Sequence, residues 1–345
     1  MKKSTLRYLL ITCIVGVTIL LLAGATGYFL FFAPTFHPDH KSAIYIDRDD
    51  TADSIIYKVK IHGNPSRLTG LQLLAKWRNP DNHLHTGRYL IHPKDNAYQL
   101  FNRIYRGHQE PVNLTVGSTR TVGQLIRQIS RQLMIDSTEI ASQITDTLFL
   151  SQNGYSLETL PCLFIPNTYQ VYWNISASKL AERLIKEHRR FWNQQRLEKA
   201  KAIGLTPKEV ATLASIVEEE TNHNEEKKVV AGLYLNRLHR GIPLQADPTV
   251  KFALQAFDLR RITNAHLQID SPYNTYKNQG LPPGPIRIPS PIGLDAVLNY
   301  TRHNYLYMCA KEDFSGTHHF AATLSEHNAN ARRYHQALNQ RKIYK

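Results

Sequence analysis

A long uncharged stretch near the N-terminus constrains this sequence more than any other feature. Residues 8–33 carry no charged side chain, and Lys2, Lys3 and Arg7 precede them. The stretch is long enough to cross a bilayer with some tilt, and it is too long for the apolar core of a signal peptide. The positive flank favours a cytoplasmic N-terminus. We therefore expect a cytoplasmic tail at 1–7, a single transmembrane helix at 8–33, and an extracytoplasmic body anchored in an inner membrane.

The body is strongly basic, which narrows the classes of partner. The formal net charge is +14, and subtracting the three positive charges before the apolar stretch (14 − 3) leaves +11. A basic exported domain suits anionic lipid head groups or an anionic polymer. Nucleic acid is the other usual partner of a basic protein, but export and the lack of a recognised nucleic-acid motif argue against it.

The pattern beyond the apolar stretch predicts an α+β protein. Residues 34–42 are typical of a short tether. Short alternating strands and amphipathic helices then follow one another over residues 43–118, as in a compact α+β module. Longer helices and a segment rich in proline and glycine make up residues 119–345. The length allows more than one domain, so we expect a small module followed by a larger α+β domain.

One helix, at residues 206–221, is marked more clearly than the others. Thr206 suits the N-cap, Pro207 suits the first helical position, and Glu209 completes a capping box. The apolar residues that follow recur at i, i+3, i+4 and i+7, so one face of the helix should be buried.

Glu218 is the candidate acid on this helix. It shares a row with Ala211 and Ala214, so it should lie at the edge of the buried face, with room beside it for a ligand. A partly buried carboxyl in such a place suits proton transfer. The alternative is an ordinary solvated helix end that carries Glu218, Glu219 and Glu220.

Glu220 does not form a flanking pair with Glu218, because residues two apart on a helix point in nearly opposite directions. Glu220 falls in the apolar row, which favours a structural, paired carboxylate. A glycan-cleaving site on this helix would therefore hold one acid. A second group would come from elsewhere, and Asp247 is the nearest candidate in sequence.

Histidine pairs raise the question of a metal site. His83 and His85 lie close together, as do His318 and His319, but neither pair has a carboxylate or cysteine at a ligand spacing. We therefore expect surface histidines and no metal site.

Several motifs occur in order in the C-terminal part of the chain. They are ASIVEEET (214–221), LYLNRLHRGIPLQADPTV (233–250), SPYNTYKNQGLPPGPI (271–286), and YLYMCA (305–310) followed by GTHHF (316–320) and EHN (326–328). This set resembles the endolytic murein transglycosylases of the YceG-like family over about residues 160–340. Asn167, Ser290 and Ala321 depart from the family's aspartate, glycine and serine. None of them is the proposed acid, so we expect them to affect substrate detail more than chemistry.

The resemblance implies a lytic transglycosylase, a carbon–oxygen lyase that cleaves the β-1,4 bond between N-acetylmuramic acid and N-acetylglucosamine inside glycan strands. Glu218 would protonate the glycosidic oxygen and then act as base on the muramoyl C6 hydroxyl, which gives a 1,6-anhydro end. Water is not the nucleophile, so one carboxyl serves both steps, and neither a metal nor an organic cofactor is needed. The resemblance also implies a LysM-like module at 43–118 and a catalytic domain at 119–345.

The resemblance further implies where the protein works and with what. Its substrate would be nascent peptidoglycan strands at the inner membrane, whose elongation it would terminate beside the penicillin-binding proteins that synthesise them. Polar residues of the matched motifs are candidates for substrate binding: Ser215, Asn236, Arg237, Gln245, Asp247, Thr249, Tyr273, Asn274, Thr275, Tyr276, Glu326, His327 and Asn328.

Alternatives remain for some of these residues and for the whole protein. Arg237 and Asp247 could form a structural ion pair, and Glu326 could be a first-turn acid that complements the dipole of the last helix. A non-catalytic peptidoglycan-binding scaffold is the alternative to an enzyme. A glycoside hydrolase, the third hypothesis, would need a water-activating carboxylate such as Asp247.

Overall fold

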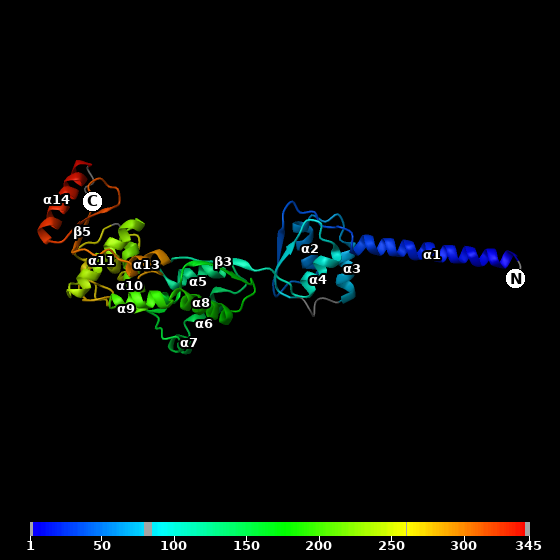
Figure 1. Cartoon of the computed structure of the whole chain (residues 1–345), viewed down its shortest axis with the longest axis horizontal. Coiled ribbons are helices and arrows are strands. Elements are labelled where there is room, and N and C mark those ends of the chain that lie inside the picture. Colours follow the sequence, from blue (N-terminus) through cyan, green and yellow to red (C-terminus); the bar gives the residue numbers. More distant parts are fainter. Residues whose placement is uncertain (1–2, 79–84, 260, 342–345) are drawn as a thin grey trace. The chain divides into compact units, whose positions relative to one another are not determined.

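The computed structural model describes residues 3–78, 85–259 and 261–341, and Figure 1 labels many of its helices and strands. The helices are α1 (Lys3–Phe31), α2 (Ala52–Gly63), α3 (Thr69–Arg78), α4 (Ala97–Tyr105), α5 (Val122–Ser130), α6 (Ser137–Ile144), α7 (Thr147–Gln152), α8 (Ala177–Phe191), α9 (Gln194–Ala202), α10 (Pro207–Glu220), α11 (Asn224–His239), α12 (Asp247–Ala253), α13 (Pro291–Leu298) and α14 (Leu324–Gln340). The strands are β1 (Ser42–Ile46), β2 (Gly87–Ile91), β3 (Val112–Val116), β4 (Asn167–Val171), β5 (Tyr307–Ala310) and β6 (His318–Ala321), with 3₁₀ helices η2 (Leu160–Leu163) and η3 (His266–Gln268).

The chain separates into two compact units. Unit 1 comprises Met1–Asn113 and Gln170–Ile175, and unit 2 comprises Leu114–Tyr169 and Ser176–Lys345. Each unit contains a hydrophobic core of its own. Helices are mixed with two-stranded sheets, so the expected mixed architecture is confirmed. The expected limits of the module and of the larger domain remain predictions.

Unit 1 begins with the apolar helix. Within α1, the segment Leu6–Phe31 is long and apolar enough to cross a membrane. The range expected to span the membrane, 8–33, is therefore helical as far as Phe31. Residues 1–2 of the expected cytoplasmic tail lie outside the described residues.

Among the described residues, the strands β1 and β2 and the helices α2, α3 and α4 make up most of the folded part of unit 1. β1 and β2 are antiparallel and place Ile44 opposite Tyr89, and both side chains are buried. α2 and α4 each begin with a capping box, at the N-caps Thr51 and Asn96, which satisfies backbone donors that a helix start otherwise leaves unpaired.

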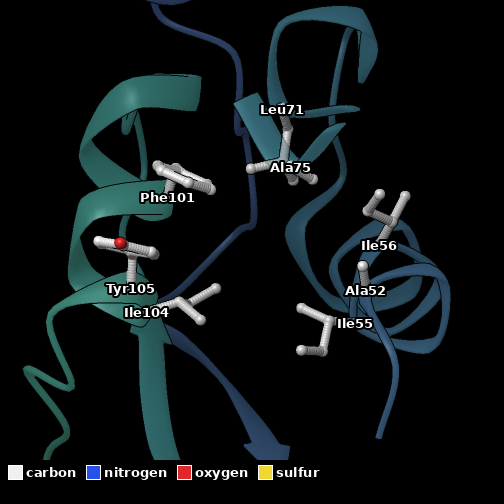
Figure 2. Close-up of a pocket in the computed structure, with 8 residues that line it drawn as sticks. All are labelled: Ala52, Ile55, Ile56, Leu71, Ala75, Phe101, Ile104 and Tyr105. Carbon is white, nitrogen blue, oxygen red and sulfur yellow. The ribbon is translucent and has the colours of Figure 1, made fainter. Parts of the chain in front are cut away.

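A small apolar pocket lies between α2, α3 and α4. Figure 2 shows side chains from the three helices pointing into it: Ala52, Ile55, Ile56, Leu71, Ala75, Phe101, Ile104 and Tyr105. Its volume is about 30 Å³, which is room for about one water and far less than a sugar ring needs. The pocket is therefore a packing gap between the helices.

Residues 34–42, expected to be a tether, contribute to the core of unit 1 instead. Phe36 is fully buried in that core. The backbone N–H groups of Thr35 and Phe36 donate to the carbonyl of Asp95 at 2.9 and 3.0 Å. The folded part of unit 1 therefore begins almost where α1 ends.

The helix α10 lies at the centre of unit 2. It packs against α9, α11, α12 and α13, and Figure 1 shows α9, α11 and α13 around it. β5 and β6 form an antiparallel pair against which α14 packs. Cys162 and Cys309, for which the sequence leaves a disulfide open, are both free thiols.

Candidate active site

The helix that carries the candidate acid forms as the sequence predicts. Thr206 is the N-cap of α10, and Thr206 and Glu209 make the reciprocal bonds of a capping box. The burial is wider than one apolar face, because every residue from Val210 to Glu218 is buried. The helix is therefore enclosed by its neighbours, and it holds the glutamates at its end in fixed places.

Glu218 is bound to the start of α13, and its side chain is only 6% exposed. The backbone N–H of Ser290 donates to its Oε2 at 2.9 Å, and the Ser290 hydroxyl donates to its Oε1. Lys227 Nζ lies 3.9 Å from Oε1, and Arg287 Nε lies 3.9 Å from Oε2. Donors and positive charge thus surround the carboxyl and fix its orientation.

Protein fills the space along the alanine row and the space between Glu218 and α13. Ala211 and Ala214, which were expected to leave room for a ligand, are part of the core of unit 2. A Cβ added to Gly293 would lie 2.7 Å from both Cγ and Cδ of Glu218, so a side chain at that position would displace the carboxyl. The expectation of open space along the alanine row is therefore wrong.

Ser290, where the resemblance led us to expect a glycine, contacts the acid itself. The segment before it is anchored, because the Ser118 hydroxyl donates to the carbonyl of Ile288 at 2.6 Å and the Ile288 N–H donates to the carbonyl of Thr119 at 2.8 Å. Ser290 is also the N-cap of α13, where its hydroxyl accepts from the N–H of Gly293 at 3.2 Å. Ser290 thus lies against the proposed acid, and the expectation that this departure affects substrate detail more than chemistry stays a prediction.

Glu219 and Glu220 have surroundings of their own. Glu219 forms an ion pair with Arg287 at 3.0 Å. Glu220 faces α11, where the Tyr234 hydroxyl donates to Oε1 at 2.5 Å. Burial raises the pKa of Glu220 to about 7; the hydrogen bond from Tyr234 opposes this rise, and the charge of Asp247 adds to it. Glu220 is thus paired, as expected, and it shares no partner with Glu218 among these contacts.

A cavity of about 330 Å³ adjoins Glu220. Five of the predicted substrate-binding residues line it: Arg237, Gln245, Asp247, Tyr276 and His327. Glu220, Tyr234 and Tyr307 line it as well, and sequence reasoning selected none of them for a site. The apolar residues around Tyr234 in the sequence favour a core position for it. Its place in the cavity wall follows only from the distant segments that meet there, which the local sequence does not reveal.

Arg237 and Asp247 do not form the ion pair that was considered for them. The Tyr276 hydroxyl donates to Oδ1 of Asp247 at 2.6 Å. Arg237 donates to the carbonyl of Leu306 at 2.8 Å and to Oε1 of Gln245 at 2.5 Å. The backbone of Gln245 has a φ of 53°, which is uncommon for a residue other than glycine and often occurs at functional sites. Arg237 therefore positions two segments of the cavity wall.

Four predicted substrate-binding residues point into the protein, and none of them is more than 1% exposed. Ser215 accepts a hydrogen bond from the N–H of Ile286 at 3.0 Å. The hydroxyls of Thr249 and Thr275 lie 2.8 Å apart, and the side-chain amide of Asn274 donates to two loop carbonyls. Their polar groups stabilise the loop over residues 271–286.

Asn236 and Tyr273 also contact protein groups. The Asn236 amide donates to the carbonyl of His303 at 2.7 Å. The ring of Tyr273 packs against Phe252 with ring centroids 4.8 Å apart. These contacts hold the segments that border the cavity.

The predicted residues of the last helix separate into different roles. Glu326 accepts from the N–H of Thr323 at 3.1 Å and completes the capping box of α14, which agrees with the first-turn alternative. His327 stacks on Tyr307 with ring centroids 5.4 Å apart and lines the cavity. Asn328 is exposed.

Each histidine of the C-terminal pair contacts one carboxylate. His318 Nδ1 lies 2.9 Å from Glu226, and His319 Nε2 lies 2.8 Å from Glu312. In the described part of the chain, no three or more potential ligands among His, Cys, Asp and Glu gather into a metal site. His83 lies outside that part.

Comparison with known proteins shows which family and which relatives the sequence matches. The sequence matches the model of the YceG-like family over residues 44–333. It is 40% identical over 130 residues to an endolytic murein transglycosylase of Bacillus subtilis (strain 168), which covers 38% of this chain and 35% of the relative. It is 28% identical over 288 residues to an endolytic murein transglycosylase of Streptococcus pneumoniae (serotype 2, strain D39), which covers 74% of this chain and 51% of the relative. The matched region thus spans about half, or less, of the length of these relatives.

A solved structure has a similar fold. It is that of a putative YceG-like protein from Listeria monocytogenes, which matches with a TM-score of 0.58 and 25% identity. The match covers 84% of this chain and 99% of that chain.

Proposed function

This chain belongs to the YceG-like family, and we propose that it is an endolytic murein transglycosylase that cuts the glycan strands of peptidoglycan. The names of its relatives support this activity. The observation that carries the assignment of the acid is the fixed position of Glu218, whose carboxyl is held by the N–H and the hydroxyl of Ser290.

The proposed reaction uses Glu218 twice. Its proton goes to the glycosidic oxygen, and the bond between that oxygen and C1 of N-acetylmuramic acid breaks. The carboxylate then takes the proton of the C6 hydroxyl, and the C6 oxygen forms a bond to C1. The reaction consumes no water, because the C6 oxygen takes the place of the leaving glycosidic oxygen on C1. The product therefore ends in 1,6-anhydromuramic acid, and Glu218 returns to its protonated state.

Ser290 can form a hydrogen bond with Glu218 in both the ionised and the protonated form of its carboxyl. A hydroxyl both donates and accepts hydrogen bonds, so it can donate to the carboxylate and accept from the carboxylic acid. The backbone N–H of Ser290 keeps Oε2 in place throughout. This hydrogen bond therefore positions the acid without requiring a second carboxyl.

The proposed place of action is the outer side of a bacterial inner membrane. α1 would anchor the chain with its N-terminus in the cytoplasm, because its first residues are basic, and the body would lie in the periplasm or its equivalent. The folded part of unit 1 would bind glycan as a LysM-like module. The enzyme would thus cut nascent strands beside penicillin-binding proteins and end their elongation.

Glu220 is the rival candidate for the acid. It lines the cavity of about 330 Å³ and its pKa is raised to about 7, which is a suitable range for a proton donor at neutral pH. Asp247 lines the same cavity and would activate water if the protein were a hydrolase.

Mass spectrometry of fragments released from purified peptidoglycan tests these assignments. The wild type is compared with Glu218→Gln, Glu220→Gln and the matched control Glu219→Gln, whose side chain pairs with Arg287. We expect 1,6-anhydro ends from the wild type and from the Glu219 variant, and none from the Glu218 variant.

Other products would change the proposal in defined ways. Loss of cleavage in the Glu220 variant alone would make Glu220 the acid. Reducing ends, heavier by one water, would assign the protein to the hydrolases, with Asp247 as the next residue to replace. Binding of glycan without any cleavage would favour a scaffold.

A further inference from the structure

We propose that one face of α3 lies in the head-group layer of the membrane and holds unit 1 against anionic lipid. This face, called the α3 face, consists of Leu73, Lys76 and Trp77, and the Arg78 guanidinium joins it by lying against the Trp77 ring. The proposal rests on the membrane anchoring proposed above. It adds a second contact with the membrane, made by the folded part of the protein.

The start of α3 is fixed against the last turn of the apolar helix. A Cβ added to Gly70 would lie 2.0 Å from the carbonyl oxygen of Leu30, so the two backbones approach as closely as a glycine allows. The side chain of Arg67 donates to the carbonyl of Ala33 at 3.1 Å, and that of Asn96 donates to the carbonyl of Phe32 at 3.1 Å. These bonds pair the two carbonyls that directly follow α1 and make a close junction with the module.

This junction places α3 near the membrane surface. The apolar segment of α1 has 26 residues, or about 39 Å of helix, whereas the hydrocarbon core of a bilayer is about 30 Å thick. The last turn of α1 therefore reaches the boundary of the hydrocarbon. Figure 1 shows α3 at the end of the module where α1 joins it.

The α3 face has the composition of an interfacial surface. Trp77 is 75% exposed and Leu73, one turn earlier, is 45% exposed. Lys76 and Arg78 are exposed beside them, and the Arg78 guanidinium lies 4.8 Å from the centre of the Trp77 ring. Tryptophan and basic residues are enriched at membrane–water interfaces, where the ring is partly immersed and the cation meets lipid phosphate.

Aromatic and basic side chains surround the same junction. The Arg67 guanidinium lies 3.9 Å from the centre of the Phe29 ring. Phe32 packs against Tyr98 with ring centroids 5.3 Å apart, and both residues are more than 40% exposed. This arrangement resembles the aromatic belt of membrane proteins. A glycan strand could also stack on a tryptophan, but the position beside the end of α1 and the positive charge favour lipid.

Fluorescence quenching in reconstituted vesicles tests the proposal. The full-length protein is placed in vesicles of phosphatidylglycerol and phosphatidylcholine, with and without bromine on the acyl chains, which quenches nearby tryptophan. The wild type is compared with Trp77→Phe and with the control Trp173→Phe, since Trp173 packs against Tyr45 elsewhere in unit 1. We expect a quenched component that disappears in the Trp77 variant, persists in the control, and weakens in Lys76→Glu/Arg78→Glu.

The outcomes separate this proposal from the anchoring on which it rests. If alkaline carbonate fails to extract the protein but Trp77 is not quenched, α1 is inserted and the α3 face does not touch lipid. Extraction by carbonate would overturn the anchoring itself. If glycan fragments alone change the emission of Trp77, the face binds glycan and the lipid proposal is refuted.

Discussion

Two half-buried groups in unit 2 are expected to make its stability depend on pH in opposite directions. Burial raises the pKa of Glu220 from 4.5 to about 7. Burial, together with the charges of Arg189 and Lys208, lowers the pKa of His188 from 6.5 to about 4. In the folded state, His188 Nε2 lies 3.1 Å from the Tyr155 hydroxyl, and Glu220 accepts a hydrogen bond from the Tyr234 hydroxyl. Unfolding breaks these contacts and exposes both Glu220 and His188 to water.

The sign of each effect follows from the proton balance between the two states. The folded state holds the Glu220 proton more tightly, so this contribution to stability is full below pH 4.5 and is lost as the pH rises through about 7. The unfolded chain binds the His188 proton more tightly, so stability is lost as the pH falls from 6.5 towards 4. Between pH 5 and 8, Glu220 lowers the free energy of unfolding by roughly 2–3 kcal/mol and His188 raises it by about 2 kcal/mol.

The two effects nearly cancel in the wild type, so single variants are needed to reveal them. From pH 5 to 8, Glu220→Gln is expected to gain about 2 kcal/mol of unfolding free energy and His188→Gln to lose roughly 2–3 kcal/mol, while the double variant changes little. Glutamine retains a hydrogen-bonding group at each site.

Urea titration of the detergent-solubilised protein measures these free energies. Trp192 is buried in the core of unit 2, and it reports on that unit once Trp77 and Trp173 are replaced by phenylalanine. Differences between each variant and the parent remove the titration of all other groups. A difference between parent and Glu220→Gln that stays constant from pH 5 to 8 would refute the raised pKa and the role of burial at this site.

Further predictions concern two glycine-to-alanine substitutions and the reactivity of two cysteine thiols. Gly293→Ala should reduce cleavage at least about tenfold, because it displaces the Glu218 carboxyl from its fixed geometry; product analysis checks this, and undiminished cleavage would contradict it. Gly123→Ala, whose added Cβ meets nothing closer than 3.7 Å, should leave cleavage unchanged and raise the free energy of unfolding by about 0.5–1 kcal/mol, as urea titration would show. Burial raises the pKa of the Cys162 thiol to about 12, so mass spectrometry after alkylation at pH 8 should find it unmodified in the folded protein and modified in urea. The half-buried Cys309 should react before it.

The sequence predicts the local features of the fold well. The capping box at Thr206, the proline at the first helical position and the length of α10 depend on neighbouring residues, and the structure confirms them. The opposite directions of Glu218 and Glu220 follow from the helical repeat. These properties depend on contacts within one element, which a pattern of neighbouring residues specifies.

The site itself depends on contacts that sequence spacing does not reveal. Ser290 meets Glu218 from a segment 72 residues away in the chain, and no local pattern indicates it. The motif residues Asn274 and Thr275 resemble ligand-binding residues by type, yet their polar groups bind the loop that contains them or the neighbouring helix. The sequence pattern likewise assigns Phe36 to a tether, and only its contacts with distant residues show that it belongs to a core.

The cavity beside Glu220 has walls that come from distant parts of the chain. α10 and α11 provide one side, and residues 306–310 and His327 provide another. During synthesis the C-terminal wall leaves the ribosome long after α10, so the cavity cannot close around a ligand until residue 327 has been made. An unfinished chain would therefore lack a complete cavity, and a ligand of this cavity would bind only after synthesis has passed residue 327.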